Sequence, residues 1–102
     1  MTHTTVHFPT LASLADKVGQ HLATSDWITI DQSRIDLFAQ ATGDHQWIHV
    51  DRVRAAAGPF GTTIAHGYLT LSLIPEIAQS AMAIDDVTMS VNYGLNRVRF
   101  MA

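Results

Sequence analysis

A short stretch of the sequence, ATGDHQWIHVD at residues 41–51, concentrates side chains that can bind a metal or transfer protons. The carboxylate of Asp44 and the imidazoles of His45 and His49 follow directly after Gly43, a residue typical of helix ends. Three interpretations are open for these groups, namely metal ligands, a proton-transfer pair, and the solvated side chains of an ordinary polar loop.

A metal site is the first interpretation. On a helix, His45 and His49 would share a face, and Asp44 or His66 would complete the ligand set. However, Gly43 ends a helix just before these residues, and the glutamate that accompanies two histidines in hydrolytic zinc helices is missing. We therefore predict that the protein uses no metal.

Proton transfer is the interpretation that the spacing favours. Asp44 and His49 flank Trp47 and Ile48, which are expected to draw the turn against the core and desolvate both groups. A carboxylate and an imidazole held close together can grip a water molecule, one taking its proton while the other donates one elsewhere. Imidazole suits this role because it gains and loses protons near neutral pH.

A partner for developing negative charge is available in the segment Ala65 to Gly67, AHG. A loop opens there into the N-terminus of a strongly apolar helix. The first N–H groups of a helix have no partner within it, and the helix dipole favours an anion. Gly67 also lets a ligand approach the backbone closely.

The composition limits the classes of function. A chain of 102 residues is enough for a single domain, which we place over residues 1–102. The net charge of −3, with six Lys and Arg, argues against nucleic acid or an anionic membrane as partner. The absence of cysteine excludes disulfides and thiolate chemistry. No signal peptide is recognisable and no apolar run approaches about 20 residues, so we expect a cytoplasmic protein.

Several elements must position these groups. We predict an amphipathic helix over residues 10–18 and a strand over residues 27–30. The next helix begins at the cap Asp31 and ends at Gly43. A short helix from Asp51 to Ala57 follows, and then a turn-rich loop over residues 58–63.

The most apolar element is a helix over residues 66–83, whose apolar residues cover nearly every side. We expect it to be buried all round, with a kink or restart at Pro75. A long strand over residues 87–100 changes its inward face near residues 94–96, which predicts a bulge or sharp bend. Two strands cannot enclose such a helix. We therefore expect either a fragment or a sheet completed by a partner.

These residues also carry a family resemblance. The segment FAQATGDHQWIHVDRVRA resembles the signature of the MaoC-like, R-specific enoyl-CoA hydratases. Gln46 and Trp47 replace the Asn-Pro pair of that signature, whereas five positions fit it: Gly43, Asp44, Ile48, His49 and Ala55. Together with GPFGTTIAHGYLTLSLIP and NYGLNRVRF, the segment is still more similar to the nodulation protein N-like branch. The resemblance runs from about SDWITI to the last residue.

The resemblance implies an α+β hot-dog fold, in which a curved antiparallel sheet wraps round a central helix, and a homodimer. It also implies further strands after VRF, so the fold is expected to be incomplete at the C-terminal end. The implied reaction is reversible addition of water to a trans-2-enoyl thioester, giving the (3R)-hydroxyacyl product. Asp44 and His49 match the catalytic pair, and Gly67 matches the glycine whose N–H forms the oxyanion hole. The substrate is a thioester of coenzyme A or acyl carrier protein, and no cofactor or metal is implied.

Residues beside these groups are predicted to contact the substrate, namely Gln46, Trp47, Ile64, His66 and Tyr68. For the aromatic side chains among them an ordinary place in the core is the alternative. For Arg97 and Arg99, contact with coenzyme A phosphates and a solvated strand edge are both open. The rival to an enzyme is a non-catalytic, acyl-thioester-binding or subunit-type hot-dog protein.

Overall fold

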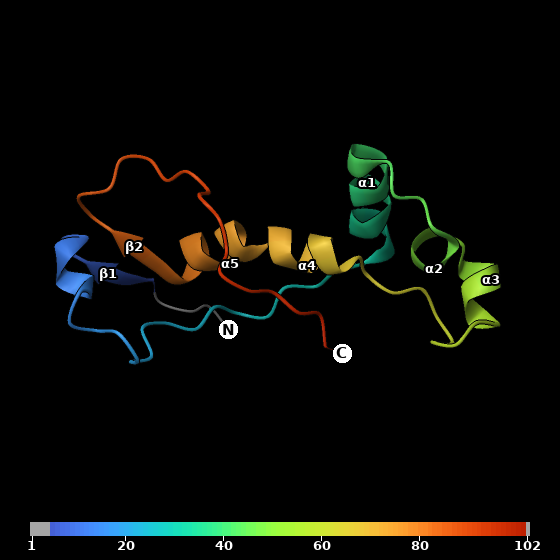
Figure 1. Cartoon of the computed structure of the whole chain (residues 1–102), viewed down its shortest axis with the longest axis horizontal. Coiled ribbons are helices and arrows are strands. Elements are labelled where there is room, and N and C mark those ends of the chain that lie inside the picture. Colours follow the sequence, from blue (N-terminus) through green and yellow to red (C-terminus); the bar gives the residue numbers. More distant parts are fainter. Residues whose placement is uncertain (1–4, 102) are drawn as a thin grey trace. The chain divides into compact units, whose positions relative to one another are not determined.

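The computed structural model describes residues 5–101 (Figure 1). Residues within this range fall into two compact units. One consists of Trp27–Ile74, and the other joins the N-terminal segment up to Asp26 with the segment from Pro75 onward. His3 lies outside the described residues. The residues that could do chemistry at the dense motif all belong to the unit Trp27–Ile74, which is described first.

Helix α1, Gln32–Thr42, begins and ends where the sequence predicts. The carboxylate of Asp31 accepts a hydrogen bond from the backbone N–H of Arg34 at 2.9 Å, which satisfies one of the unpaired donors at the helix start. At the other end Gly43 adopts φ 79°, and its N–H donates to the carbonyl of Ala39 at 2.8 Å. This left-handed cap turns the chain sharply into Asp44.

Two short helices follow, α2 (Trp47–Val50) and α3 (Arg52–Ala56). The predicted short helix is confirmed in α3, where the carboxylate of Asp51 accepts from the N–H of Arg54 at 3.0 Å. Helix α2 was not predicted, because four residues are too few to show a helical period. The loop after α3 returns to α2, since the N–H of Ile64 donates to the carbonyl of Ile48 at 2.9 Å.

The apolar segment after this loop forms two helices, α4 (Gly67–Ser72) and α5 (Ile74–Ala81). The interruption at Leu73 confirms the predicted break, because Pro75 has no N–H to donate to the preceding turn. The predicted burial on all sides is wrong for the described residues. Leu69 and Ala81 are buried, but Ile74 is 49% exposed, because no broad sheet within residues 5–101 covers these helices.

In the other unit, strand β1 (Val6–Phe8) pairs in parallel with β2 (Met82–Ile84), with Val6 opposite Met82. The N–H of Asp85 extends this pairing by donating to the carbonyl of Phe8 at 2.8 Å. The helix predicted over residues 10–18 is reduced to the 3₁₀ turn η1, Ala12–Leu14. The apolar stripe of that segment is not buried, since Val18 is 90% exposed, so tertiary packing does not extend the turn.

The α+β class is confirmed, but two predicted strands are corrected. Within residues 5–101 the single sheet is the parallel β1–β2 pair, and residues 27–30 and 87–100 belong to no strand. A strand is stable only when a neighbour pairs with its backbone groups, and neither segment has such a neighbour among the described residues. The side chains of Trp27 and Tyr93 are accordingly fully exposed.

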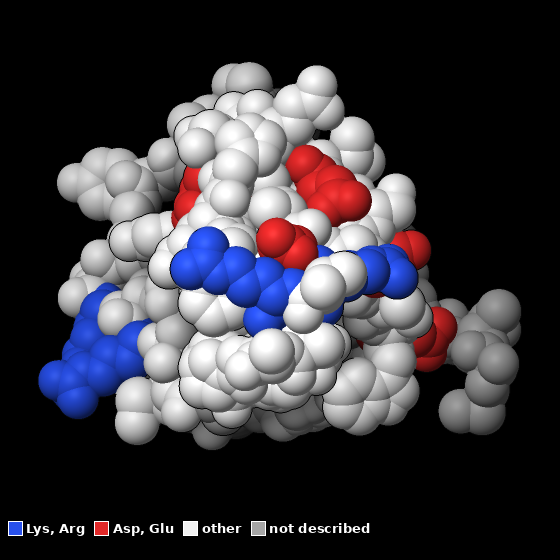
Figure 2. All heavy atoms as spheres, turned by 90° about the vertical axis from the view of Figure 1, so that its right-hand side faces the viewer, with Lys and Arg blue, Asp and Glu red and all other residues white. Residues whose placement is uncertain are grey.

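On the face drawn in Figure 2, basic and acidic side chains lie side by side near the centre, among uncharged side chains. None of the helices in the described part of the chain combines the length and apolar character that a membrane crossing requires.

Candidate functional site

Three of the predicted residues converge in the unit Trp27–Ile74. Asp44 follows the end of α1, His49 lies in α2, and His66 directly precedes α4. One carboxylate oxygen of Asp44 and one ring nitrogen from each histidine lie within 4.8 Å of one another. Both imidazoles are buried, with 7% of His49 and 2% of His66 exposed, whereas Asp44 is exposed to solvent. The cluster therefore joins a buried pair of imidazoles to a carboxylate that solvent can reach.

The ring of His49 is held in one orientation. Its Nδ1 lies 2.8 Å from the backbone carbonyl oxygen of Ile64. Because a carbonyl oxygen only accepts, Nδ1 carries the hydrogen in this bond and donates it. In the neutral ring the lone pair is then on Nε2, which is the atom able to take a proton.

The ring of His66 lies between two aromatic neighbours. It stacks on His49 with a centroid separation of 3.8 Å and an angle of 21°, and it meets Phe38 at 4.9 Å and 56°. Its Nε2 lies 3.0 Å from the backbone carbonyl oxygen of Asp44 and must donate to it. The other nitrogen, Nδ1, is buried and has no hydrogen-bond partner among the described residues.

Asp44 is placed by the turn that Gly43 creates. Its N–H points to the hydroxyl of Thr42 at 3.4 Å, and its carboxylate accepts from the N–H of Gln46 at the same distance. Both bonds are at the long limit for N–H to oxygen contacts and are correspondingly weak. The carboxylate consequently keeps most of its capacity to accept a proton or a hydrogen bond from a ligand.

Asp44, His49 and His66 are residue types that can bind a metal ion. Both imidazoles bond a backbone carbonyl through one nitrogen, which is common among metal-binding histidines. A metal ion, however, lies in the ring plane about 2 Å from the nitrogen. The ring planes of His49 and His66 are stacked and inclined by only 21°, so they intersect much farther than about 2 Å from the ring nitrogens. His49 and His66 therefore do not fit one ion in this arrangement.

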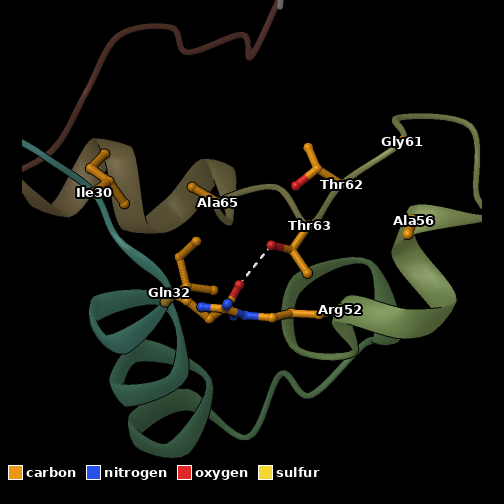
Figure 3. A pocket seen from close by; sticks show the side chains of 9 residues that line it. Ile30, Gln32, Arg52, Ala56, Gly61, Thr62, Thr63 and Ala65 are labelled. Carbon is orange, nitrogen blue, oxygen red and sulfur yellow. Dashed lines mark hydrogen bonds between the residues drawn. The ribbon is translucent and has the colours of Figure 1, made fainter.

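Behind the cluster, Gln32 links three elements. Its amide Nε2 donates to the carbonyl of His49 at 2.7 Å, and its Oε1 accepts from the hydroxyl of Thr63 at 2.6 Å. Figure 3 shows this second bond inside a cavity of about 450 Å³, with the side chain of Arg52 reaching toward Gln32. Sequence reasoning missed Gln32, because a glutamine at the first position of a helix carries no distinctive signal.

The other predicted site residues are placed as follows. Gly67 is the first residue of α4, and its N–H makes no hydrogen bond within residues 5–101. Ile64 takes part through its backbone, as the acceptor for His49. The ring of Trp47 lies 4.4 Å from the guanidinium carbon of Arg54. The side chains of the remaining candidates are exposed to solvent. They are His45, Gln46, Tyr68, Arg97 and Arg99.

The fold and the site define an α+β protein with a carboxylate and a buried imidazole at the start of an apolar helix. Residues 13–102 match the family described as the MaoC like domain. The chain is 56% identical over 95 residues to the 3-hydroxyacyl-thioester dehydratase Z of Mycobacterium tuberculosis. It is also 56% identical over 99 residues to the nodulation protein N of Rhizobium leguminosarum. The chain therefore belongs to the MaoC-like family, as the sequence motif predicted.

The extent of these matches matters for the function. The alignments cover 93% and 95% of this chain, but only 63% and 62% of the dehydratase and the nodulation protein, respectively. A shorter match, 46% identical over 48 residues, joins the chain to the 3-hydroxybutyryl-CoA dehydratase of Methylorubrum extorquens. It covers 47% of this chain and 31% of that relative. The chain thus spans somewhat less than two thirds of the curated relatives that it matches along most of its length.

Proposed function

We propose that the protein catalyses the reversible hydration of trans-2-enoyl thioesters to (3R)-3-hydroxyacyl thioesters. Asp44 and His49 act as the acid–base pair. The observation that carries the proposal is the fixed imidazole of His49, whose donor Nδ1–H is bound to Ile64 and whose Nε2 is left to act as a base. Two similar proteins are named as dehydratases of a 3-hydroxyacyl thioester and of 3-hydroxybutyryl-CoA, which supports the reaction class.

The spacing of the pair suits a water molecule. Two hydrogen bonds of about 2.8 Å that meet at one water oxygen span about 4.5 Å. This is compatible with the separation of at most 4.8 Å between a carboxylate oxygen of Asp44 and one of the two ring nitrogens of His49. Asp44 and His49 would both orient a water molecule held between them, and either group can take a proton from that water.

The reaction then follows from this placement. As the pair removes a proton from water, the water oxygen bonds to C3 of the enoyl thioester. The electrons of the C2–C3 double bond move toward the thioester carbonyl, which develops enolate character. Asp44 and His49 share the transfer of a proton to C2, which completes the addition without any other reactant. In the reverse direction the same groups remove the C2 proton and release water.

The developing oxygen charge needs a donor. We assign this role to the N–H of Gly67, which has no partner within the described residues and begins α4. One such donor is often worth about 3 kcal/mol of activation free energy. We further propose, from the family resemblance, a hot-dog fold and a homodimer for the whole protein, with coenzyme A or acyl carrier protein as the thioester carrier.

The test is hydration of crotonyl-CoA by the full chain, followed by loss of the enoyl absorbance. We expect turnover that falls roughly 100- to 10,000-fold in Asp44→Asn and His49→Ala, because general acid–base groups contribute about that much. His45→Ala and Asp16→Asn are matched controls, since both side chains are exposed and outside the cluster. If the chain shows no turnover, or if its turnover does not fall in Asp44→Asn and His49→Ala, the enzyme proposal is refuted. Saturable binding of crotonyl-CoA without turnover would instead favour a non-catalytic thioester-binding protein.

A further inference from the structure

We infer that His66 is a positioning residue for the acid–base pair, holding the backbone of Asp44 with one atom and the ring of His49 with one face. This inference rests on the proposed function for its catalytic meaning. The positions of Asp44 and His49 that we attribute to His66 depend on contacts that can be measured without turnover.

The first contact is the hydrogen bond between the side chain of His66 and the backbone of Asp44. The 3.0 Å separation between Nε2 and the carbonyl oxygen requires Nε2 to carry the hydrogen. That bond joins the end of the α1 turn to the start of α4, across 22 residues of sequence. Because the bonds of Asp44 to Thr42 and Gln46 are both 3.4 Å long, the bond from His66 is the shortest of those that hold this residue in the turn.

The second contact is the stacked pair of imidazoles. A ring bound only through Nδ1 can still rotate about its hydrogen bond and swing Nε2 away from the water site. With the face of His66 at 3.8 Å and 21°, and Ile64 fixing Nδ1, His49 is constrained on two sides. Phe38 supports the same ring of His66 at 4.9 Å and 56°, so the stack is braced against α1.

The unpaired nitrogen shows that packing alone does not explain the choice of histidine. His66 buries Nδ1 without a hydrogen bond to any described residue, which is unfavourable for a polar atom. A phenylalanine would stack without this cost, but it has no donor for Asp44. A glutamine would offer a donor but no ring. Histidine is the side chain that makes both contacts.

The backbone of His66 adds a third link. Its carbonyl accepts from the N–H groups of Leu69 at 3.0 Å and Thr70 at 3.2 Å, which starts α4. The next residue is Gly67, the proposed oxyanion donor. One residue thus connects the acid, the base and the donor, and a small displacement of His66 is expected to disturb all three.

The experiment separates the two side-chain contacts in the full chain. His66→Phe keeps the ring and removes the donor, His66→Gln keeps a donor and removes the ring, and His66→Ala removes both. With crotonyl-CoA we expect kcat to fall roughly 10- to 100-fold in His66→Ala, a range typical of misplaced catalytic groups, while KM changes little. The Phe and Gln variants are expected to retain intermediate kcat values. His45→Ala is the control.

Nitrogen-15 NMR of the imidazoles tests the geometry without turnover. In the native chain we expect His49 as the Nδ1–H tautomer and His66 as the Nε2–H tautomer. In His66→Ala and His66→Gln the loss of the stacked ring is expected to shift and broaden the His49 Nε2 signal, because the ring can then rotate about its Nδ1–H bond to Ile64. A His49 Nε2 signal of native shift and width in these variants, or a kcat for His66→Ala equal to that of His45→Ala, would overturn the inference. If the native chain is inactive, the proposed function fails, and the NMR result alone decides the role of His66.

Discussion

Gln32 provides a demanding test of how the unit Trp27–Ile74 holds its site. Replacing it by leucine, which has a similar size, removes three hydrogen bonds at once. Two of them, to the carbonyl of His49 and from the hydroxyl of Thr63, are partly buried, whereas the third, to Asp36, is exposed. The substitution therefore disconnects α1 from α2 and from the loop before α4 without deleting much apolar volume.

The magnitude follows from these contacts. A partly buried hydrogen bond contributes about 1 kcal/mol net, and an exposed one contributes little. We therefore expect Gln32→Leu to lower the free energy of unfolding by about 2 kcal/mol. Gln32→Glu is expected to be at least as harmful at neutral pH, because its carboxylate would face the carbonyl of His49 and the carboxylate of Asp36.

The assay is urea unfolding of the full chain, followed by tryptophan fluorescence and circular dichroism. Gln40→Leu is the matched control, because Gln40 lies on the same helix with its side chain exposed. Thr63→Val and the double variant complete a cycle, with an expected coupling of about 1 kcal/mol between Gln32 and Thr63. If Gln32→Leu costs no more than Gln40→Leu, the network does not hold the site and the reasoning is refuted.

Two glycine substitutions test the turns that flank the site. Gly43→Ala is expected to lower the free energy of unfolding by about 1–2 kcal/mol, because φ is 79° at this position. Gly94→Ala is the control and should cost less, because Gly94 has open space around it and no positive φ. Equal losses of stability in the two variants would contradict this reasoning. Gly58→Ala places a Cβ 2.9 Å from Cζ3 of Trp47, so we expect a loss of about 1–3 kcal/mol together with a change in tryptophan fluorescence, and an unchanged stability would contradict the packing.

Local signals in the sequence were sufficient for several features of the fold. Asp31 and Gly43 mark the ends of α1, and both act through backbone bonds within a few residues. The cap Asp51 marks α3 for the same reason, and Pro75 marks the break between α4 and α5. Each of these features depends on one residue and its immediate neighbours.

Features that depend on distant partners were predicted less well. The strands expected over residues 27–30 and 87–100 have alternating or β-branched patterns, yet no paired strand is present for them in residues 5–101. The parallel pairing of Val6–Phe8 with Met82–Ile84 was not foreseen, because three-residue strands give almost no alternation.

In the site, too, local features were predicted better than features that depend on distant residues. The motif predicted that Asp44 and His49 lie near each other, since only four residues separate them in the chain. The sequence offered His66 as a neighbour of the site, but not its stacking on His49 or its bond to Asp44, because these depend on the loop that Ile64 ties to α2. Gln32, whose bond to Thr63 spans 31 residues, was not foreseen either.

The most direct test of the central claim is the product formed from crotonyl-CoA in D₂O by the native chain and by Asp44→Asn. We predict a (3R)-3-hydroxybutyryl thioester that carries one deuterium at C2, with its rate of formation at least roughly 100-fold lower in the variant. A (3S)-product, or equal rates for the native chain and Asp44→Asn, would contradict the account.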